Sequence, residues 1–426
     1  MAEAGEKPGL ALGAYLVASR ALPFMAPALL RRRLARGKED PARWREKLGE
    51  PTSPRPEGRL IWLHAVGLGE VLALRGLIVE MARQAGATGM GAPEFLITST
   101  ARSSAQVIGA NLPPRTRHQF RPLDAPAYLA RFLDHWRPDL SIWAEQEIWP
   151  GAVLAADRRG IPVAMVNARI TAESHARRRR LRGLYADVLG RLALTAAQDQ
   201  ASAARLTDLG ARGLRVTGSL KSAAPPLAAD PAELARIQAQ LAGRRVWVAA
   251  STHSGDEAEV LAALPIGDDA LTLIAPRDVT RADALADALC ARGLSFARRS
   301  AGEVPDAKTQ VWLADSYGEL GLWYRLAEVA LIGGGFDRIG GHNPWEAAAL
   351  GLPILHGPDT ANFLADYKAL DEAGAAMPLA TGGLAAALAS PDLATMGARA
   401  KALSDRAQGS LAPLARDLLA LMRGAG

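Results

Sequence analysis

The chain holds 426 residues, of which 49% are hydrophobic and 22% charged, so it is too long for one ordinary core and too apolar for a disordered chain. Cys290 is its only cysteine, which excludes an internal disulfide and a cysteine-based metal site and fits a reducing compartment. The net charge of +6 is modest, so where the basic residues lie matters more than their number.

The first predicted element is an apolar segment, residues 10–30, with about the ~20 residues that a bilayer span needs. Arg20 interrupts it, and the basic segment 31–47 follows with eight Lys or Arg against three acids. Such charge attracts anionic membrane surfaces and favours a cytoplasmic location for the rest of the chain. We expect residues 1–50 to form a membrane anchor that spans the bilayer or lies in its interface, and a helix packed on the protein body is the alternative.

Short apolar runs then alternate with longer helical patterns, an order that predicts parallel sheets with crossover helices. Segment 221–231, rich in Pro and Ala, predicts a linker between two doubly wound domains, 51–220 and 232–426. Two such domains are expected to form a cleft, with ligands at the carboxyl ends of the strands. The predicted strands are 60–65, 95–98, 139–143, 163–166, 192–196 and 214–217, then 246–250, 271–275, 311–314, 329–332 and 353–355.

Three motifs of the first domain follow predicted strands and carry candidate catalytic side chains. Glu70 opens a helix after a glycine turn, where the helix dipole favours a carboxylate that accepts a proton. Glu145 and Glu147 stand between two tryptophans, and paired acids at a strand end suit acid–base work. Lys221 offers a point charge for a phosphate or carboxylate. Taken alone, a first-turn Glu, a helix cap and a surface Lys explain the same residues.

The second domain begins with motifs that suit an anionic ligand. Pro276 and Arg277 end its second strand, and the Arg side chain is the planar fork that binds phosphate. Another loop, 315–320, follows a later strand. The sequence has no His pair with zinc-ligand spacing, no Gly-x-Ser-x-Gly and no Walker loop. We therefore expect no catalytic metal and no covalent serine nucleophile.

The strongest local signal is the glycine-rich segment 333–346. Asn343 suits a helix N-cap, Pro344 the first helical position and Glu346 the third. The glycines before the helix are expected to leave backbone N–H groups free, which predicts an anion site at the helix N-terminus. A well-capped helix without a ligand is the alternative.

Taken in chain order, the motifs resemble those of the 3-deoxy-D-manno-oct-2-ulosonic acid (Kdo) transferases, from about residue 10 to the 360s. The resemblance implies the GT-B fold, in which two doubly wound domains face each other and a final helix returns to the first. It implies inverting transfer of Kdo from CMP-Kdo to a lipid A precursor (lipid IVA) in lipopolysaccharide synthesis, without metal or cofactor, at the cytoplasmic face of the inner membrane. The motifs are WLHAVGLGE, RPDLSIWAEQEIWP, VNARIT, TGSLK, ASTHSGDE, APRD, DSYGEL, GGHNPWEAAALGLPILHGP and ANF.

The resemblance also implies a role for each matching residue. Glu70 matches the general base that activates the acceptor hydroxyl, and Glu145 and Lys221 match residues that stabilise the transition state. The basic N-terminal segment matches the membrane attachment of the family. The CMP-binding segments match Pro276, Arg277, Tyr317, Gly318, Glu319, Asn343, Pro344, Trp345 and Glu346.

The sequence departs from the family pattern at several positions. Gly67-Leu68 replace the usual Ser-Val, Gln146 and Gly151 replace Thr and Asn, and Gly335 replaces a Ser hydroxyl. The alternatives are another GT-B enzyme, such as an N-acetylglucosaminyltransferase or a UDP-sugar epimerase, and a non-catalytic protein that binds membrane surfaces. Protection against unfolding by CMP, but not by UDP, would separate the enzymes. Nucleic-acid binding is disfavoured because the basic runs lack interleaved aromatics.

Overall fold

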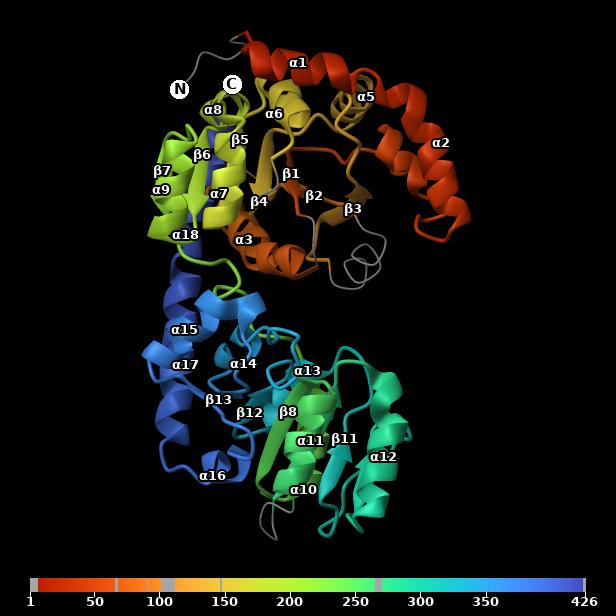
Figure 1. The fold of residues 1–426 in the computed structure, drawn as a ribbon, viewed down its shortest axis with the longest axis vertical. Helices are drawn as coiled ribbons and strands as arrows, with labels where there is room; N and C mark the ends of the chain where they lie inside the picture. The colour runs from red at the N-terminus through yellow and green to blue at the C-terminus, as the bar shows by residue number, and fades with distance from the viewer. Residues whose placement is uncertain are drawn as a thin grey trace. The chain divides into compact units, whose positions relative to one another are not determined.

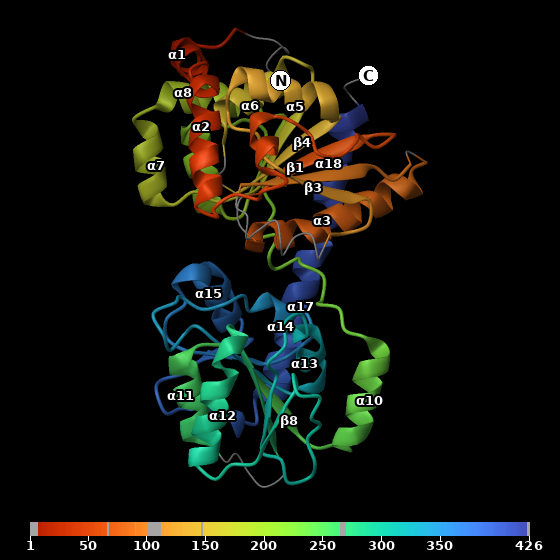
Figure 2. The same ribbon diagram turned by 90° about the vertical axis from the view of Figure 1, so that its right-hand side faces the viewer.

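The computed structural model describes residues 7–65, 68–89, 91–100, 112–145, 148–264 and 270–423, with the side chains of all but 68–72 and 423. Contacts divide the chain into two units, Met1–Ala224 with Ala407–Gly426, and Pro225–Arg406. The division falls within the segment expected to be a linker. Within the described residues each unit has one seven-stranded parallel sheet with helices on both faces (Figures 1 and 2), which confirms the predicted α/β class.

The first unit is built on a sheet whose strand order reverses at its centre. The strands run in the order β3 (Thr116–Phe120), β2 (Glu94–Ser99), β1 (Leu60–His64), β4 (Leu140–Ala144), β5 (Val163–Ala168), β6 (Leu194–Ala197) and β7 (Leu214–Val216). The helices are α1 (Leu10–Ser19), α2 (Leu22–Ala35), η1 (Trp44–Leu48), α3 (Leu68–Ala87), α5 (Pro126–Trp136), α6 (Pro150–Asp157), α7 (Ala172–Arg179), α8 (Arg182–Gly190), α9 (Gln200–Asp208) and α18 (Leu411–Arg423).

Two hydrophobic layers cover the faces of this sheet, because successive strand residues point to opposite sides. On one face Ile61 and Leu63 pack with side chains of α3 and of α18, the last helix of the chain. On the other face Leu60 and Trp62 pack with α5, α6, α8 and α9. Figure 2 shows α3 on one side of β1, with α5 and α6 on the other. The strands are apolar throughout because both faces are covered.

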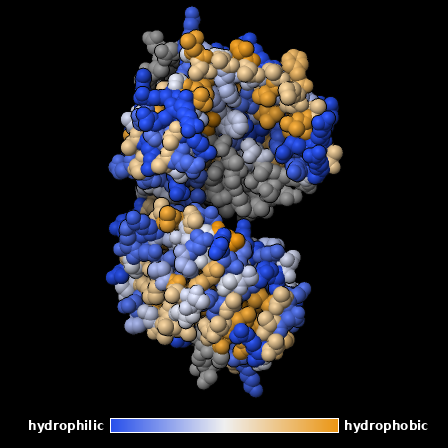
Figure 3. Space-filling model, viewed as in Figure 1, coloured by the Kyte–Doolittle hydropathy of each residue, from blue (hydrophilic) through white to orange (hydrophobic). Residues whose placement is uncertain are grey.

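The apolar N-terminal segment forms two helices, α1 and α2, which belong to the first unit. Leu12 of α1 is fully buried among α6 and α8, and Leu30 of α2 is buried against η1 and α5. Figure 3 shows hydrophobic side chains on the outer surface over both helices. Within the described residues no single helix has the length and apolar character to cross a membrane. Together α1 and α2 meet those criteria, with a bend of 53° between them.

The second unit repeats the same design with another central reversal. Its strands run in the order β10 (Phe296–Arg298), β11 (Val311–Leu313), β9 (Leu271–Pro276), β8 (Val246–Thr252), β12 (Ala330–Ile332), β13 (Ile354–His356) and β14 (Ala376–Pro378). The helices are α10 (Pro231–Leu241), α11 (Ser254–Ala263), η2 (Val279–Arg281), α12 (Ala282–Ala291), α13 (Leu320–Leu326), α14 (Trp345–Ala348), η3 (Ala361–Phe363), α15 (Leu364–Glu372), α16 (Leu384–Leu388) and α17 (Leu393–Gly409).

Helices again cover both faces of this sheet. Side chains of α10, α13, α14 and α15 pack with Val246 and Val248 on one face. Side chains of α11, α12 and α16 pack with Trp247 and Ala249 on the other. In Figure 2, α11 and α12 lie on one side of β8 and α10 lies on the other. The helix α17 begins in the second unit and ends in the first, and α18 then packs on α3.

The eleven predicted strands are all present, with ends that differ by at most two residues. The sequence did not reveal three further strands, β3, β10 and β14, each of which lies at an edge of its sheet.

Candidate active site

In the first unit the strand order reverses between β1 and β4, the place where α/β sheets bind ligands. The chain leaves β1 toward α3, whose third residue is Glu70, and it leaves β4 at Glu145. The two predicted carboxylate motifs therefore follow adjacent strands at the same edge. The side chain of Glu70, and residues Gln146 and Glu147, lie outside the described residues.

Two predicted catalytic residues, Glu145 and Lys221, lie side by side. The Lys221 Nζ atom is 3.2 Å from Glu145 Oε1, and both side chains are mostly buried, with exposures of 20% and 17%. Lys221 follows β7, where the Ser219 hydroxyl accepts a hydrogen bond from its backbone N–H. Two motifs far apart in the sequence thus place an ion pair at the carboxyl edge of the sheet.

Sequence reasoning assigned no role to Asn167, which lies beside this pair. Its side chain donates a long hydrogen bond of 3.4 Å to Glu145 Oε1 and accepts one of 2.9 Å from the N–H of Leu220. Glu145 and Asn167 both have left-handed backbone, with φ of 59° and 54°, which is uncommon outside glycine. The motif VNARIT contains Asn167, but nothing in that motif reveals its contacts.

The aromatic residues around Glu145 have structural roles. Trp143 is buried in the core, and its ring lies edge-on to His64 at 4.8 Å between centroids. The guanidinium carbon of Arg121 lies 3.7 Å from the ring centroid of Trp149. Burial, followed by the positive charge of Arg121, lowers the pKa of His64 well below its usual value, although a bond to Thr98 opposes the shift. His64 is therefore neutral at physiological pH.

The second unit also gathers its candidate residues at one edge. All its strand pairs are parallel, so the segments that follow β8, β9, β11 and β12 lie at the carboxyl edge of the sheet. These segments carry His253, Arg277, Tyr317 and the glycines from Gly333 onward. The reversal of strand order between β8 and β12 puts the glycine segment beside His253.

The glycine segment is held by the protein itself, contrary to the expectation of free N–H groups. The fully buried Asp256 accepts hydrogen bonds from the N–H of Gly334 at 2.7 Å and of Phe336 at 3.2 Å. The N–H groups of Gly333 and Gly341 donate to backbone carbonyls. The expectation is therefore wrong for the N–H groups of Gly333, Gly334 and Gly341, because carboxylate and carbonyl groups of the chain itself accept their hydrogen bonds.

Close packing explains the glycines instead. A Cβ atom on Gly333 would lie 2.4 Å from the carbonyl oxygen of Ser251, and one on Gly335 would lie 2.7 Å from the N atom of Gly357. Ser251 has a φ of 56° and lies at a shift of register between β8 and β9, which is typical of a β-bulge. At this bulge the backbone of Ser251 lies against Gly333, and only glycine leaves room for so close an approach.

Arg277 lies near a pair of histidines and Glu346. The Nε2 atoms of His253 and His342 are 2.9 Å apart, and their rings are stacked. Burial, helped by the charge of Arg277, lowers the pKa of His342 to about 4, so this ring is neutral at pH 7. Burial raises the pKa of Glu346, while Asn343 and Arg277 act in the opposite direction. The exposed Arg277 therefore provides the positive charge in this group.

The predicted helix start at Asn343 is one residue early. The helix α14 begins at Trp345, after Pro344. Asn343 Oδ1 accepts a hydrogen bond of 3.2 Å from the backbone N–H of Trp345. Asn343 Nδ2 in turn donates to Glu346 at 3.3 Å, so the two polar side chains hold each other. Trp345 is buried, and its indole N–H donates to Asp366 at 2.8 Å. Its described contacts lie within the fold, so direct contact with CMP stays a prediction.

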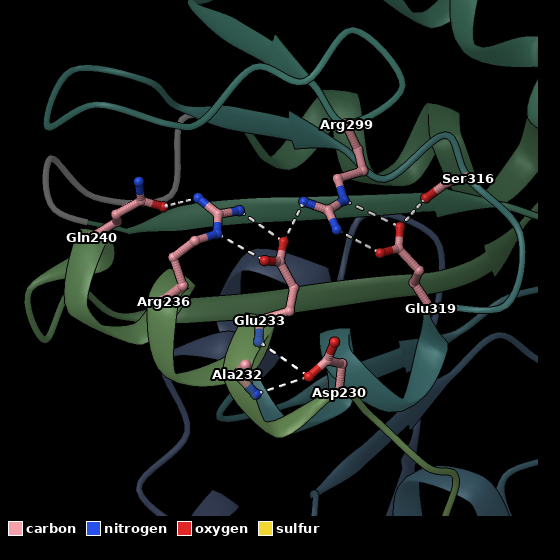
Figure 4. Close-up of polar contacts among 8 residues, drawn as sticks. All are labelled: Asp230, Ala232, Glu233, Arg236, Gln240, Arg299, Ser316 and Glu319. Carbon is pink, nitrogen blue, oxygen red and sulfur yellow. Dashed lines mark hydrogen bonds and ion pairs between the residues drawn. The ribbon is translucent and has the colours of Figure 1, made fainter.

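The loop with Tyr317, Gly318 and Glu319 is anchored by an ion-pair network, shown in Figure 4. Arg299 donates to Glu319 and to Glu233 of α10. Burial favours a higher pKa of Glu319, but hydrogen bonds from Arg299 and Ser316 outweigh it and lower the pKa. The carboxylate of Glu319 thus anchors the loop, while the Tyr317 side chain is 72% exposed and Gly318 has a φ of 86°.

The described residues contain no group of three or more His, Cys, Asp or Glu side chains that could hold a metal ion.

The two doubly wound units, with polar groups at the carboxyl edges of their sheets, define the class as a protein of the GT-B fold. A crystal structure of UDP-GlcNAc 2-epimerase from Neisseria meningitidis shares this fold, with a TM-score of 0.56, 12% identity, and coverage of 85% of this chain and all of the other. A crystal structure of the C-terminal CMP-Kdo binding domain of WaaA from Acinetobacter baumannii is 28% identical and covers 46% of this chain and 96% of its own. The TM-score of this match is 0.34.

Sequence comparisons place the chain more narrowly. Residues 42–224 match the family model for 3-deoxy-D-manno-octulosonic-acid transferase (kdotransferase). The probable mitochondrial 3-deoxy-D-manno-octulosonic acid transferase of Arabidopsis thaliana is 34% identical over 81% of this chain and 79% of its own length. The transferase of Bordetella pertussis is 36% identical over 76% and 77%. The chain belongs to the 3-deoxy-D-manno-octulosonic acid transferase family and is an enzyme of lipopolysaccharide synthesis.

Proposed function

We propose that this enzyme transfers Kdo from CMP-Kdo to a lipid A precursor, lipid IVA, with inversion of the anomeric centre. The observation that carries the proposal is the pairing of Glu145 with Lys221 at the carboxyl edge of the first sheet. The resemblance assigns both residues to the transition state, and family membership over most of the chain supports the same chemistry.

The transfer step exchanges one bond to the sugar for another. The acceptor hydroxyl oxygen forms a bond to the anomeric carbon of Kdo, and Glu70 accepts the hydroxyl proton. The bond from that carbon to the phosphate oxygen of CMP breaks on the opposite face, and CMP leaves with the electron pair. The Glu145 carboxylate offsets the positive charge that develops on the sugar ring. Lys221 offsets the negative charge that develops on the phosphate oxygens of the departing CMP.

The second unit would hold the donor. Its glycine N–H groups are largely bonded to Asp256 and to backbone, so we assign the donor's charge to Arg277. The polar pair of Asn343 and Glu346 offers amide and carboxylate groups for the ribose or base. Pro276 and the loop with the exposed Tyr317 complete the set that we assign to CMP.

We also propose that α1 and α2 dock on the cytoplasmic face of an anionic inner membrane. Five of their large apolar side chains are exposed, and exposed arginines follow on α2, so both hydrophobic and electrostatic attraction are available. The exposed apolar residues are Leu10 (96%), Val17 (64%), Phe24 (88%), Met25 (69%) and Leu29 (59%).

Vesicle binding tests the docking surface. Phe24→Glu with Met25→Glu should weaken binding to vesicles that contain anionic lipid, because two charges would enter the apolar contact. Val79→Glu is the matched control, since Val79 is 51% exposed on α3. Equal binding by both variants would contradict the docking proposal.

Transfer itself is tested with purified protein, fresh CMP-Kdo and a tetraacylated lipid A precursor, followed by mass spectrometry. A gain of one or more Kdo units with release of CMP is expected and also counts the sugars added. Glu70→Gln should abolish the gain and leave binding of CMP nearly intact, because it removes the base and keeps the shape. A Glu70→Gln enzyme with near-normal turnover would refute the assignment of the base.

A further inference from the structure

Three neighbouring strands of the first sheet end in polar residues that are joined through Asn167. The side chain of Asn167 donates to Glu145, which follows β4, and accepts from the N–H of Leu220, which precedes Lys221. The main-chain carbonyl of Asn167 accepts a hydrogen bond of 3.0 Å from Gln198, which follows β6. Asn167 thus contacts Glu145 directly and holds the backbone of Leu220, the residue that precedes Lys221.

The backbone of Asn167 is held in an unusual conformation. Its φ of 54° is left-handed, and the pairing of β5 with β6 shifts register between Met165 and Ala168. A β-bulge of this kind turns a side chain away from its regular strand direction, and bulges occur often beside active sites. Such conformations cost energy and persist where the surrounding contacts or the function require them. Here the bulge turns a buried amide toward Glu145.

We propose that Asn167 is a positioning residue that fixes the Glu145 carboxylate and the Lys221 segment in one geometry for transfer. The proposal rests on the proposed function, in which the pair acts on the transition state. Asparagine suits the task because its side chain donates and accepts at the same time. The contact with Glu145 is long at 3.4 Å, and catalytic hydrogen bonds often shorten when substrate binds.

Two variants separate positioning from folding. Asn167→Gly removes both side-chain contacts but tolerates the left-handed backbone, so it tests the amide without adding strain. Asn167→Asp keeps the shape and the acceptor for Leu220 but places a second carboxylate beside Glu145. Gln240→Glu makes the same amide-to-acid change on the exposed face of α10 and serves as the charge control.

Kinetics with CMP-Kdo and the lipid acceptor should show a fall in kcat on the order of 10- to 100-fold in Asn167→Gly, with KM changed less than threefold. A loss of this order follows when a catalytic group is misplaced by about 1 Å. In Asn167→Asp the acidic limb of the kcat–pH profile should move to higher pH, because the added carboxylate disfavours the ionised form of its neighbour. An unmoved limb would mean that the side chain at position 167 does not act on the Glu145 carboxylate during transfer.

A second readout does not depend on turnover. An amine-reactive reagent, followed by peptide mass spectrometry, should label Lys221 several-fold faster in Asn167→Gly than in the wild type, because the pair is less firmly held. If the wild type transfers no Kdo, the proposed function fails, and the labelling alone decides the positioning role. Unchanged labelling together with an unmoved acidic limb would overturn the proposal, even if both variants lose activity. Faster labelling in Asn167→Gly supports it.

Discussion

Replacement of Arg299 by methionine would test how the loop with Tyr317 is held. Arg299 donates to Glu319 Oε1 at 2.6 Å, to Glu319 Oε2 at 3.2 Å and to Glu233 at 2.7 Å, and its side chain is 19% exposed. Methionine keeps the apolar stem near Trp323 but removes all three hydrogen bonds. Glu233 retains its hydrogen bonds from Arg236, so the main loss is at Glu319, whose remaining side-chain partner among the described residues is Ser316 (Figure 4).

The expected loss of stability follows from the number of hydrogen bonds removed. A hydrogen bond to a charged group contributes about 1.5–3 kcal/mol when buried, and partial exposure reduces the value. The two bonds to Glu319 together should contribute about 2 kcal/mol. For a unit of this size the loss lowers the Tm by roughly 4–8 °C. If the loop must be reordered when donor binds, the same 2 kcal/mol weakens CMP binding by up to about 30-fold.

Thermal unfolding and CMP titration measure the two effects on Arg299→Met and on Arg299→Lys. The lysine side chain of Arg299→Lys reaches one carboxylate instead of two. Its losses of Tm and of CMP-binding free energy should therefore be about half of those in Arg299→Met. A Tm within about 1 °C of the wild type, together with unchanged CMP affinity in Arg299→Met, would refute the reasoning. A lower Tm with unchanged affinity would show that the network supports the fold but not the donor loop.

Three further predictions concern the second unit. Asp256→Ala should lower stability by about 3–5 kcal/mol in denaturant unfolding, because three backbone N–H groups would lose a buried acceptor, and Asp256→Asn should lose less. Gly333→Ala should lower the Tm by several degrees because its Cβ meets backbone, whereas Gly86→Ala, with open space, should leave the Tm unchanged or higher. Hydrogen bonds from Arg236 and Arg299 lower the pKa of Glu233 to about 2 from 4.5. Its contribution to stability is therefore complete above about pH 4.5 and is lost as the pH falls toward 2, and unfolding of Glu233→Gln should show a weaker dependence on acid across that window.

The interior of both sheets was predictable because covered strands are apolar throughout. The segment 246–250 is an example, since β8 packs under helices on both faces. The three strands that escaped prediction lie at sheet edges, where only one neighbour constrains the sequence. β3 reads TRHQF, which lacks an apolar run, and β14 ends in Pro378, which an edge strand tolerates.

The pairing of Glu145 with Lys221 could be expected only through the family resemblance. Each motif follows a predicted strand of the same sheet, but the motifs are far apart and nothing in either indicates that the two side chains meet. Asn167 escaped notice for another reason. Its contacts with Glu145 and Leu220 depend on a β-bulge and a left-handed backbone. A single asparagine within an apolar strand predicts neither feature.

The glycine segment shows why a correct local pattern gave a wrong assignment of its hydrogen bonds. Glycines before a helix do expose N–H groups, and that rule predicts an anion. The glycine pattern does not show which carboxylate or phosphate accepts these N–H groups. Here the acceptor is Asp256 of α11, the helix that follows the adjacent strand β8. The consequence reaches the donor site. With the amides of Gly334 and Phe336 engaged and His342 neutral at pH 7, the exposed Arg277 presents a positive charge at this edge to a phosphate. Because Arg277 also acts on the pKa of the half-buried Glu346, an anion bound there would compete with that carboxylate, which should then hold its proton more tightly.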